Sequence, residues 1–474
     1  MSWNNLKNTL ELLYIPAMTT IHFIRWSVLF LLVMVSHSIL TAQADTEIRV
    51  NLYGYHPNMP KKVLILSRTI LDNLKLQLRS GDKLIEEYTT ETNNNGWEPF
   101  PHTYTIDFSE IEDTGQYYFQ VPNTNIKSVV FQISQYPDWQ EDVISFIRTQ
   151  RCGYNPHVRE FCHQQDGLSF FGIRSDSTRI DVTGGWHDAG DQLKYLITGS
   201  NTTARLLMAY MMSPNTFTDS FDERGIKGSN GLPDVLDEAI WGLEWILKMH
   251  PRKNELYHQV ADDRDHRGFK LPHLDNADYG WGSNNFRPAY FATGKPQGLS
   301  KYKSKATGIA NLAGRSAATL ALGYEVLIKF PKKKIFAESC LQAALELYEM
   351  GRKKEGFQQG NSFCAPYRYE ENTRADDMEW AAAQLYKVTQ KKQYLEQARK
   401  YSREIGTWSW MERDTARHYE MYPFVNMGHY ALWQVGNEDD KKQMEAYYDH
   451  NLQQISKRSA RNPYGVGHLF IWCS

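Results

Sequence analysis

The chain has 474 residues, of which 41% are hydrophobic, and its formal net charge is −2. This length allows two or three domains, and the hydrophobic fraction is enough for a sizeable buried core. The near-neutral charge offers no basic surface for nucleic acid, so binding to DNA or RNA is not indicated. Five widely scattered cysteines, an odd number, argue against a disulfide scaffold.

The first 44 residues are typical of an export signal with an N-terminal extension. Arg25 precedes an apolar run at residues 26–35, and Thr41-Ala42-Gln43-Ala44 offers small residues for cleavage. The run is shorter than a membrane-spanning helix needs. Because the extension is long for a signal, Met18 is an alternative start. We expect export to an extracellular or periplasmic location, with cleavage after Ala44 or membrane anchoring there.

Residues 45–135 have the pattern of an immunoglobulin-like β-sandwich. Short runs with β-branched or aromatic residues alternate with turn signals such as Asn93-Asn94-Asn95-Gly96. None of these runs carries residues that suggest catalysis. The expected strands cover residues 47–52, 62–66, 74–78, 102–108, 115–121 and 128–133.

From residue 136 to residue 474 the pattern changes to helical periodicity and predicts an all-α domain of helix hairpins. A long connection at residues 253–306 is rich in Asp, Gly, Tyr and Trp, and long loops in compact domains are usually functional. The expected helices cover residues 139–152, 191–212, 233–250, 307–329, 334–350, 375–389, 393–405, 424–435 and 439–459.

The last residues, Asn462 to Ser474, resemble a loop that leads into a further apolar helix. Leu-Phe-Ile-Trp near a terminus would expose an apolar patch. We therefore expect a domain that lacks its last helices. The alternative is a terminus that folds back and is covered.

The run from Gly184 to Asp191, Gly-Gly-Trp-His-Asp-Ala-Gly-Asp, is the most informative motif. It places Asp188 and Asp191 three residues apart among glycines, which permit tight turns and close approach to a ligand. Two acids on such a turn suit the activation of water. A structural turn, a helix cap and a cation site are the alternatives.

With Arg151-Cys152-Gly153, Cys162-His163 and Asp376-Asp377-Met378-Glu379-Trp380-Ala381, this motif resembles glycoside hydrolase family 9, in particular endoglucanases with an N-terminal immunoglobulin-like module. The resemblance covers about residues 45–474. It implies an (α/α)6 barrel and hydrolysis of β-1,4-glucan with inversion. By motif match, Asp191 is the base and Asp188 helps to hold the water.

The resemblance fails at the general acid. In the family this residue is a Glu near the end of the barrel. The last Glu of this chain is Glu445, inside a charged helix away from any matching motif. We therefore expect the acid to be absent from this chain, which puts its activity in doubt because general acid–base assistance is worth about 10² to 10⁴ in rate.

Two groups of residues are candidate metal ligands. Two thiols and two imidazoles, Cys152, Cys162, His163 and His187, suit tetrahedral structural zinc, and the resemblance implies the same set. A Cys152–Cys162 disulfide or unlinked core cysteines are the alternatives. Calcium is a second candidate cofactor, with oxygen ligands from Asp234, Asp237 and Glu238, together with Asp262, Asp263 and Asp265. The alternative for these acids is a helix N-terminus.

Aromatic rings and imidazoles in loops or at helix starts are candidates for stacking on glucosyl units. Each of them is also a candidate for the core. The candidates are Trp281, Tyr290, Tyr422, His429 and Trp433.

The sequence thus supports a secreted β-1,4-glucanase acting on a β-glucan polysaccharide or oligosaccharide, with no stable protein partner implied. A catalytically inactive, truncated remnant with at most glycan binding is the second hypothesis. A zinc-stabilised helical interaction protein is the third, and it leaves the ordered motifs unexplained.

Overall fold

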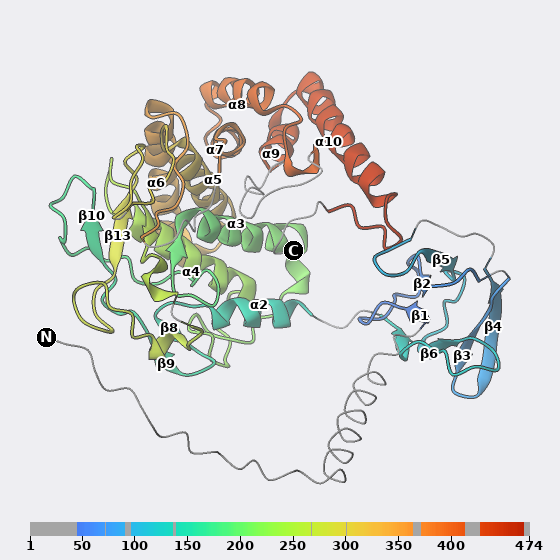
Figure 1. Cartoon of the computed structure of the whole chain (residues 1–474). Helices are drawn as coiled ribbons and strands as arrows, with labels where there is room; N and C mark the ends of the chain where they lie inside the picture. Colours follow the sequence, from blue (N-terminus) through green and yellow to red (C-terminus); the bar gives the residue numbers. More distant parts are fainter. Residues whose placement is uncertain are drawn as a thin grey trace, which may run out of the picture. The chain divides into compact units, whose positions relative to one another are not determined.

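In the computed structural model the chain divides into two compact units, residues 1–135 and 136–474 (Figure 1). The residues whose structure is described are 45–71, 73–90, 96–135, 139–266, 268–299, 301–363, 371–412 and 427–468.

The first unit contains two antiparallel sheets, with strand orders β1-β2-β5 and β4-β3-β6-β7. Their inward side chains form one core in which Val63, Ile65, Leu78 and Phe119 are fully buried. The predicted β-rich module is therefore confirmed. The strands are β1 (Thr46–Arg49), β2 (Lys62–Ser67), β3 (Lys75–Ser80), β4 (Lys83–Thr89), β5 (His102–Asp107), β6 (Gly115–Gln120) and β7 (Phe131–Ile133).

The second unit is mainly helical, and every predicted helix has a counterpart among the described residues. Helix α3 begins at Leu196 and not at Asp191, because the residues before it form a turn and a short strand. The helices are α2 (Gln140–Thr149), α3 (Leu196–Met212), α4 (Asp234–Met249), α5 (Ala310–Leu327), α6 (Lys334–Lys353), α7 (Ala375–Thr389), α8 (Lys392–Ile405), α9 (Met427–Val435) and α10 (Glu438–Ser459).

The helices pack as successive hairpins. Helices α3, α5, α7 and α9 pack on one another in series, and each contacts the helix that follows it in sequence. Nearly every residue of α5 is buried, whereas α8 buries only one face. Close approach in the inner series needs small residues: a Cβ at Gly314 would lie 2.9 Å from the backbone of Asp377. This pattern indicates an inner row and an outer row of helices.

A small sheet with the order β10-β13-β12-β11 lies in the helical unit. The long connection expected at residues 253–306 supplies two of its strands, so it is more structured than the sequence suggested. The elements are β10 (Leu168–Phe170), β11 (Lys194–Tyr195), β12 (Tyr257–Val260), β13 (Pro288–Phe291) and the 3-10 turns η2 (Asp263–Asp265) and η3 (Pro272–Leu274). A two-stranded hairpin, β8 (Tyr154–Asn155) with β9 (Glu160–Phe161), precedes it.

Within the described parts of the chain, the helices are too short or too polar to span a lipid bilayer.

Candidate active site and metal centre

The segment from Gly184 to Asp191 forms a tight turn. Gly184 and Gly185 have φ of 94° and 72°, the left-handed region that favours glycine. A Cβ at Gly185 would come within 2.6 Å of the Trp245 ring, so the indole leaves no room for a larger residue. The turn therefore depends on glycine for both its conformation and its packing.

Both predicted catalytic acids are anchored to the backbone of one residue, Leu193. The amide of Asp188 donates to the Leu193 carbonyl at 2.8 Å, and the amide of Leu193 donates to Asp191 Oδ1 at 3.3 Å. Thr198 Oγ1, in the first turn of α3, also donates to Asp188 Oδ1 at 3.3 Å. Asp188 and Asp191 thus lie on the same turn, as the spacing predicted.

A histidine that the sequence analysis did not select contacts Asp191. His266 Nε2 lies 3.1 Å from Asp191 Oδ2, and His266 Nδ1 lies 3.4 Å from Asp265 Oδ1. The hydrogen bond and charge of Asp191 raise the pKa of His266, against the opposing effect of burial. Burial, followed by the charge of Asp191, raises the pKa of Asp265 to about 7.

The four predicted zinc ligands come together: one ligand atom from each of Cys152, Cys162, His163 and His187 lies within 4.8 Å of the others. Tetrahedral zinc with ordinary bond lengths needs edges of about 3.3 Å between nitrogens and about 3.6 Å between sulfur and nitrogen. His163 Nδ1 and His187 Nε2 are 3.3 Å apart, and Cys162 Sγ lies 3.8 Å from His187 Nε2. The donor set therefore fits zinc in type, number and spacing.

Local folding explains why these ligands meet. The β8–β9 hairpin pairs Tyr154 with Phe161, which brings Cys152 close to Cys162. The amide of Cys152 donates to the Gly185 carbonyl at 2.9 Å, and this contact brings His187 close to both cysteines. His163 Nε2 bonds Asp275 Oδ2 at 3.0 Å, an arrangement that orients metal-binding imidazoles.

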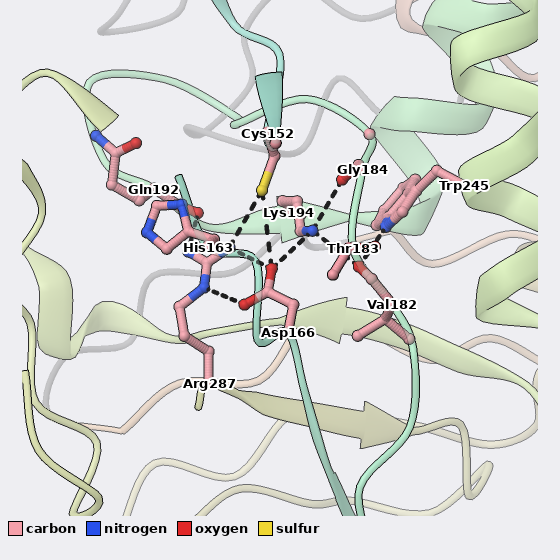
Figure 2. A network of polar contacts seen from close by, with 12 residues as sticks. Cys152, His163, Asp166, Val182, Thr183, Gly184, Gln192, Lys194, Trp245 and Arg287 are labelled. Carbon is pink, nitrogen blue, oxygen red and sulfur yellow. Dashed lines mark hydrogen bonds and ion pairs between the residues drawn. The ribbon is translucent and has the colours of Figure 1, made fainter. Parts of the chain in front are cut away.

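Buried charges surround Cys152 (Figure 2). Arg287 donates two hydrogen bonds to Asp166, each of 2.7 Å, and Lys194 Nζ lies 2.8 Å from the same carboxylate. Arg287 Nη2 also donates to Cys152 Sγ at 3.6 Å, and Arg287 Nη1 donates to the Gln192 carbonyl at 2.6 Å. Burial opposes ionisation of Cys152, yet Cys162, Lys194 and the nearby imidazoles hold its pKa well below the ordinary value.

The structure corrects two predicted sugar contacts. The Tyr290 side chain is 1% exposed and its hydroxyl donates to Asp262, so no ring face is available for stacking. His429 is 3% exposed, with Nδ1 on Glu379 at 2.9 Å and Nε2 on the Gly406 carbonyl at 2.8 Å. Both side chains hold the core together.

The other candidates for sugar contact differ from Tyr290 and His429 in their exposure to solvent. Trp433 is 38% exposed, but its Nε1 donates to Glu445 of α10 at 2.9 Å, which ties the two helices together. Trp281 is half-buried beside the Phe170 ring and stays a prediction. Tyr422 lies outside the described residues.

The predicted calcium ligands are occupied by protein donors. The carboxylate of Asp234 accepts from the amides of Ser220 and Phe221 at 3.0 and 2.9 Å. The carboxylate of Glu238 accepts from Arg151 and Trp186 at distances between 2.6 and 3.1 Å. Asp237 accepts from Asn230, and burial raises its pKa to about 6. Among the described residues, these three acids do not form a group with ligand-like spacing. The calcium hypothesis is therefore not supported.

A different acidic group, Glu371, Asp376 and Asp377, does have oxygens within 4.8 Å of one another. Arg315 lies among them, with Nε 2.6 Å from Asp377 and Nη2 3.5 Å from Asp376. Burial and the charge of Asp376 raise the pKa of Glu371 to about 8. The guanidinium thus supplies a cation to this group from the protein itself.

Comparison with known proteins identifies the family. The family model for glycosyl hydrolase family 9 matches residues 136–474, and the model for the cellulase N-terminal Ig-like domain matches residues 43–125. The chain belongs to glycosyl hydrolase family 9.

Individual relatives agree with this assignment. Endoglucanase D of Acetivibrio thermocellus is 27% identical over 74% of this chain and 53% of its own length. A metagenome-derived glycoside hydrolase family 9 endoglucanase has the same fold, with a TM-score of 0.69, 24% identity and coverage of 89% of this chain and 75% of its own. A Zn-binding triple mutant of the endoglucanase J30 matches with a TM-score of 0.66 and 21% identity, over 86% and 73% of the two chains. The chain spans about half the length of the first curated relative.

Proposed function

We propose that this protein hydrolyses β-1,4-glucan links with inversion at the anomeric carbon, and that Asp191 is the general base. The observation that carries the proposal is the attachment of Asp188 and Asp191 to Leu193, which holds two acids on one glycine-dependent turn. Membership of glycosyl hydrolase family 9 supports the same reaction. The side chain of Asp191 is 17% exposed, so one part of it is open to solvent.

In this reaction Asp191 removes a proton from a water molecule as the water oxygen bonds to the anomeric carbon. The bond from that carbon to the leaving oxygen breaks, and the leaving oxygen takes a proton from a separate acid. Asp188 helps to hold the water. The acid and base stand about 6.5–9.5 Å apart in inverting enzymes, which leaves room for the water.

For the general acid we make no assignment among the described residues. Asp265 has a suitably raised pKa of about 7, but its side chain is fully buried and cannot reach a substrate. Glu445 is bonded to Trp433 on the neighbouring helix.

We also propose that Cys152, Cys162, His163 and His187 hold a structural zinc ion. Four protein ligands close the coordination sphere, so zinc there would stabilise the fold and offer no open position for chemistry. The fit of the donor set supports this, and one structural neighbour is a Zn-binding triple mutant of the family 9 endoglucanase J30. The ion would connect the β8–β9 hairpin to the turn that carries Asp188.

The proposed substrate is a β-glucan polysaccharide or oligosaccharide, and we propose Trp281 as a contact for it. The proposed location is outside the cytoplasm, which rests on the signal-like pattern of the first 44 residues.

Release of reducing sugar from carboxymethylcellulose tests the proposed reaction. Asp191→Asn should lower kcat by about 10² to 10⁴, because it removes the general base. Proton NMR of the first product should give the α-anomer from a β-linked substrate. No turnover by folded, zinc-loaded protein would overturn the proposal in favour of a glycan-binding protein without activity.

A further inference from the structure

We propose that a pocket between helix α4, the β8–β9 hairpin and the first residues of the glycine-rich turn is a second binding site, and that it takes a short segment of a neutral glycan. The volume of the pocket is about 600 Å³, within the range of roughly 300 to 1,000 Å³ that small-ligand sites usually have. Among the described residues, its lining includes neither Asp188 nor Asp191. The pocket therefore adds a site to the proposed reaction and does not depend on that reaction.

One face of α4 supplies much of the pocket wall. Its lining residues recur every three or four positions, so they lie on the same side of the helix. Trp241 Nε1 donates to the Gly185 carbonyl at 2.8 Å, and Trp245 Nε1 donates to the Val182 carbonyl at 3.2 Å. These two bonds fix the helix face against the turn. The lining residues of α4 are Trp241, Glu244, Trp245 and Lys248.

Aromatic rings give the pocket flat apolar surfaces. Phe161 is 56% exposed, and its ring centroid lies 5.1 Å from that of Tyr154, its partner across the hairpin. Both rings line the pocket together with the half-buried Trp241. The C–H faces of a sugar ring pack on such surfaces, whereas its hydroxyl groups need polar partners at the edges.

The turn keeps one side of the pocket open and rigid. A Cβ at Gly184 would meet no protein atom within 4 Å, so this part of the backbone faces open space. Lys194 Nζ donates to the Val182 and Gly184 carbonyls at 2.9 and 2.8 Å (Figure 2). The site is therefore formed before a ligand arrives, which lowers the entropy cost of binding.

Glu244 is the polar group of the pocket that lacks a protein partner. Among the described residues, none donates a hydrogen bond to its carboxylate or forms an ion pair with it. The side chain is exposed to the pocket, yet the surrounding protein raises its pKa, against the charges of Lys333, Lys248 and Arg151. A carboxylate with incomplete hydration gains from a hydroxyl donor of the ligand.

The two cations of the lining already have partners. Arg224 forms an ion pair with Asp222 at 3.0 Å, and Lys248 forms one with Asp181 at 3.2 Å. An acidic ligand would therefore gain little from them and would be repelled by Glu244.

A cationic ligand is the alternative, since carboxylates and aromatic rings together attract ammonium groups. The guanidinium of Arg151, however, already lies over the Trp241 ring, 4.4 Å from its centroid. Lys248 and Arg224 would also repel a second cation. A neutral ligand with C–H faces and hydroxyl groups fits the whole lining best.

Hydrogen–deuterium exchange with cellobiose as the probe tests the pocket directly. In the full, zinc-loaded chain, cellobiose should slow amide exchange at residues 153–161. Glu244→Ala should need about tenfold more cellobiose for the same protection, because a hydrogen bond to a charged group is lost. Phe161→Ala should need about 2- to 10-fold more. Glu396→Ala and Phe146→Ala replace exposed residues outside the lining and should match the wild type.

Two results would overturn the proposal: no protection of the hairpin by cellobiose, or the same protection in Glu244→Ala as in the controls. Stronger protection by the positively charged glucosamine dimer would overturn the assignment of a neutral ligand. Native gels that contain hydroxyethylcellulose distinguish a free sugar from a polysaccharide. Greater mobility of Glu244→Ala than of Glu396→Ala in these gels supports binding of the polymer, and equal mobility together with cellobiose protection supports a site for short glycans.

Kinetics separate this pocket from the catalytic cleft. Glu244→Ala should leave kcat and KM for a short soluble cello-oligosaccharide unchanged. A loss of kcat/KM equal to the loss of cellobiose affinity would assign the pocket to the cleft and overturn the proposal of a second site. If the wild type hydrolyses no glucan, the proposed function fails, and cellobiose protection of the hairpin still decides whether the pocket binds sugar.

Discussion

Replacing Asp265 by asparagine should make the protein more stable at neutral pH. Asparagine keeps a carbonyl oxygen that accepts from the Gln192 amide, and it is nearly the same size as aspartate. It differs in having no charge to bury. Asp265 is fully buried and close to Asp191, so its charged form is disfavoured in the folded protein.

The sign and size of the effect follow from the pKa of Asp265, which rises from an ordinary 3.8 to about 7 on folding. Between these values the folded chain holds a proton that the unfolded chain has released, so stability falls as pH rises. At about 1.4 kcal/mol per pH unit, the full interval costs about 4 kcal/mol. Because Asp191 contributes part of this shift, about 4 kcal/mol is an upper value for the gain.

Urea unfolding followed by circular dichroism measures this gain between pH 4 and pH 8. The free energy of unfolding of Asp265→Asn, relative to wild type, should be near zero at pH 4 and rise until about pH 7. Asp278→Asn is a control of opposite sign. Hydrogen bonds from the Gly280 and Gly282 amides lower the pKa of Asp278, so its stabilisation is present above the unfolded pKa and lost in acid. Parallel wild-type and Asp265→Asn curves at every pH would refute the reasoning.

Two further variants test the metal centre and the helix core. Asp275→Ala removes the acceptor of His163 Nε2 and should weaken zinc binding about 10- to 100-fold. Competition with a chromophoric chelator measures this affinity, and an unchanged value would contradict the ligand assignment. His429→Ala leaves Glu379 buried without its partner and should cost about 3–5 kcal/mol in urea unfolding, whereas the more exposed His450→Ala should cost about 1 kcal/mol or less. Because Glu379 raises the pKa of His429 despite burial, the difference should be full in acid and shrink as pH rises through that pKa; a difference independent of pH would contradict this.

The sequence alone predicted the elements whose signals are local. Helices such as α4 and α7 repeat apolar residues with helical spacing, and their limits in the structure lie close to the expected ones. Strand β4 was missed because most of its side chains are exposed, so it shows no apolar alternation. The acid pair and the four proposed zinc ligands were also selected from the sequence, because glycine spacing and ligand type are visible in short segments and the family resemblance implies the same ligand set.

Contacts that depend on distant segments were not predictable in this way. Arg287 contacts Asp166 and Cys152 only because β10 and β13 pair, and no spacing in the sequence predicts the register of these two strands. The aromatic candidates failed for a related reason. Composition places Tyr290 in a loop-like region, but whether a ring faces solvent or the core depends on strand pairing.

The backbone of Gln192 connects the two parts of the site. Its amide donates to Asp265, and its carbonyl accepts from Arg287, which also donates to the sulfur of Cys152. The residue that follows the proposed base is therefore fixed on one side by Asp265 and on the other by Arg287, which lies beside the proposed zinc ligands. A displacement at the metal centre would be transmitted to Asp191 through the single peptide unit of Gln192. Because the placement of reacting groups is worth orders of magnitude in rate, such a displacement should lower the rate. The position of the base is thus a property of the small sheet and the metal centre together, and the glycine-rich turn alone does not determine it.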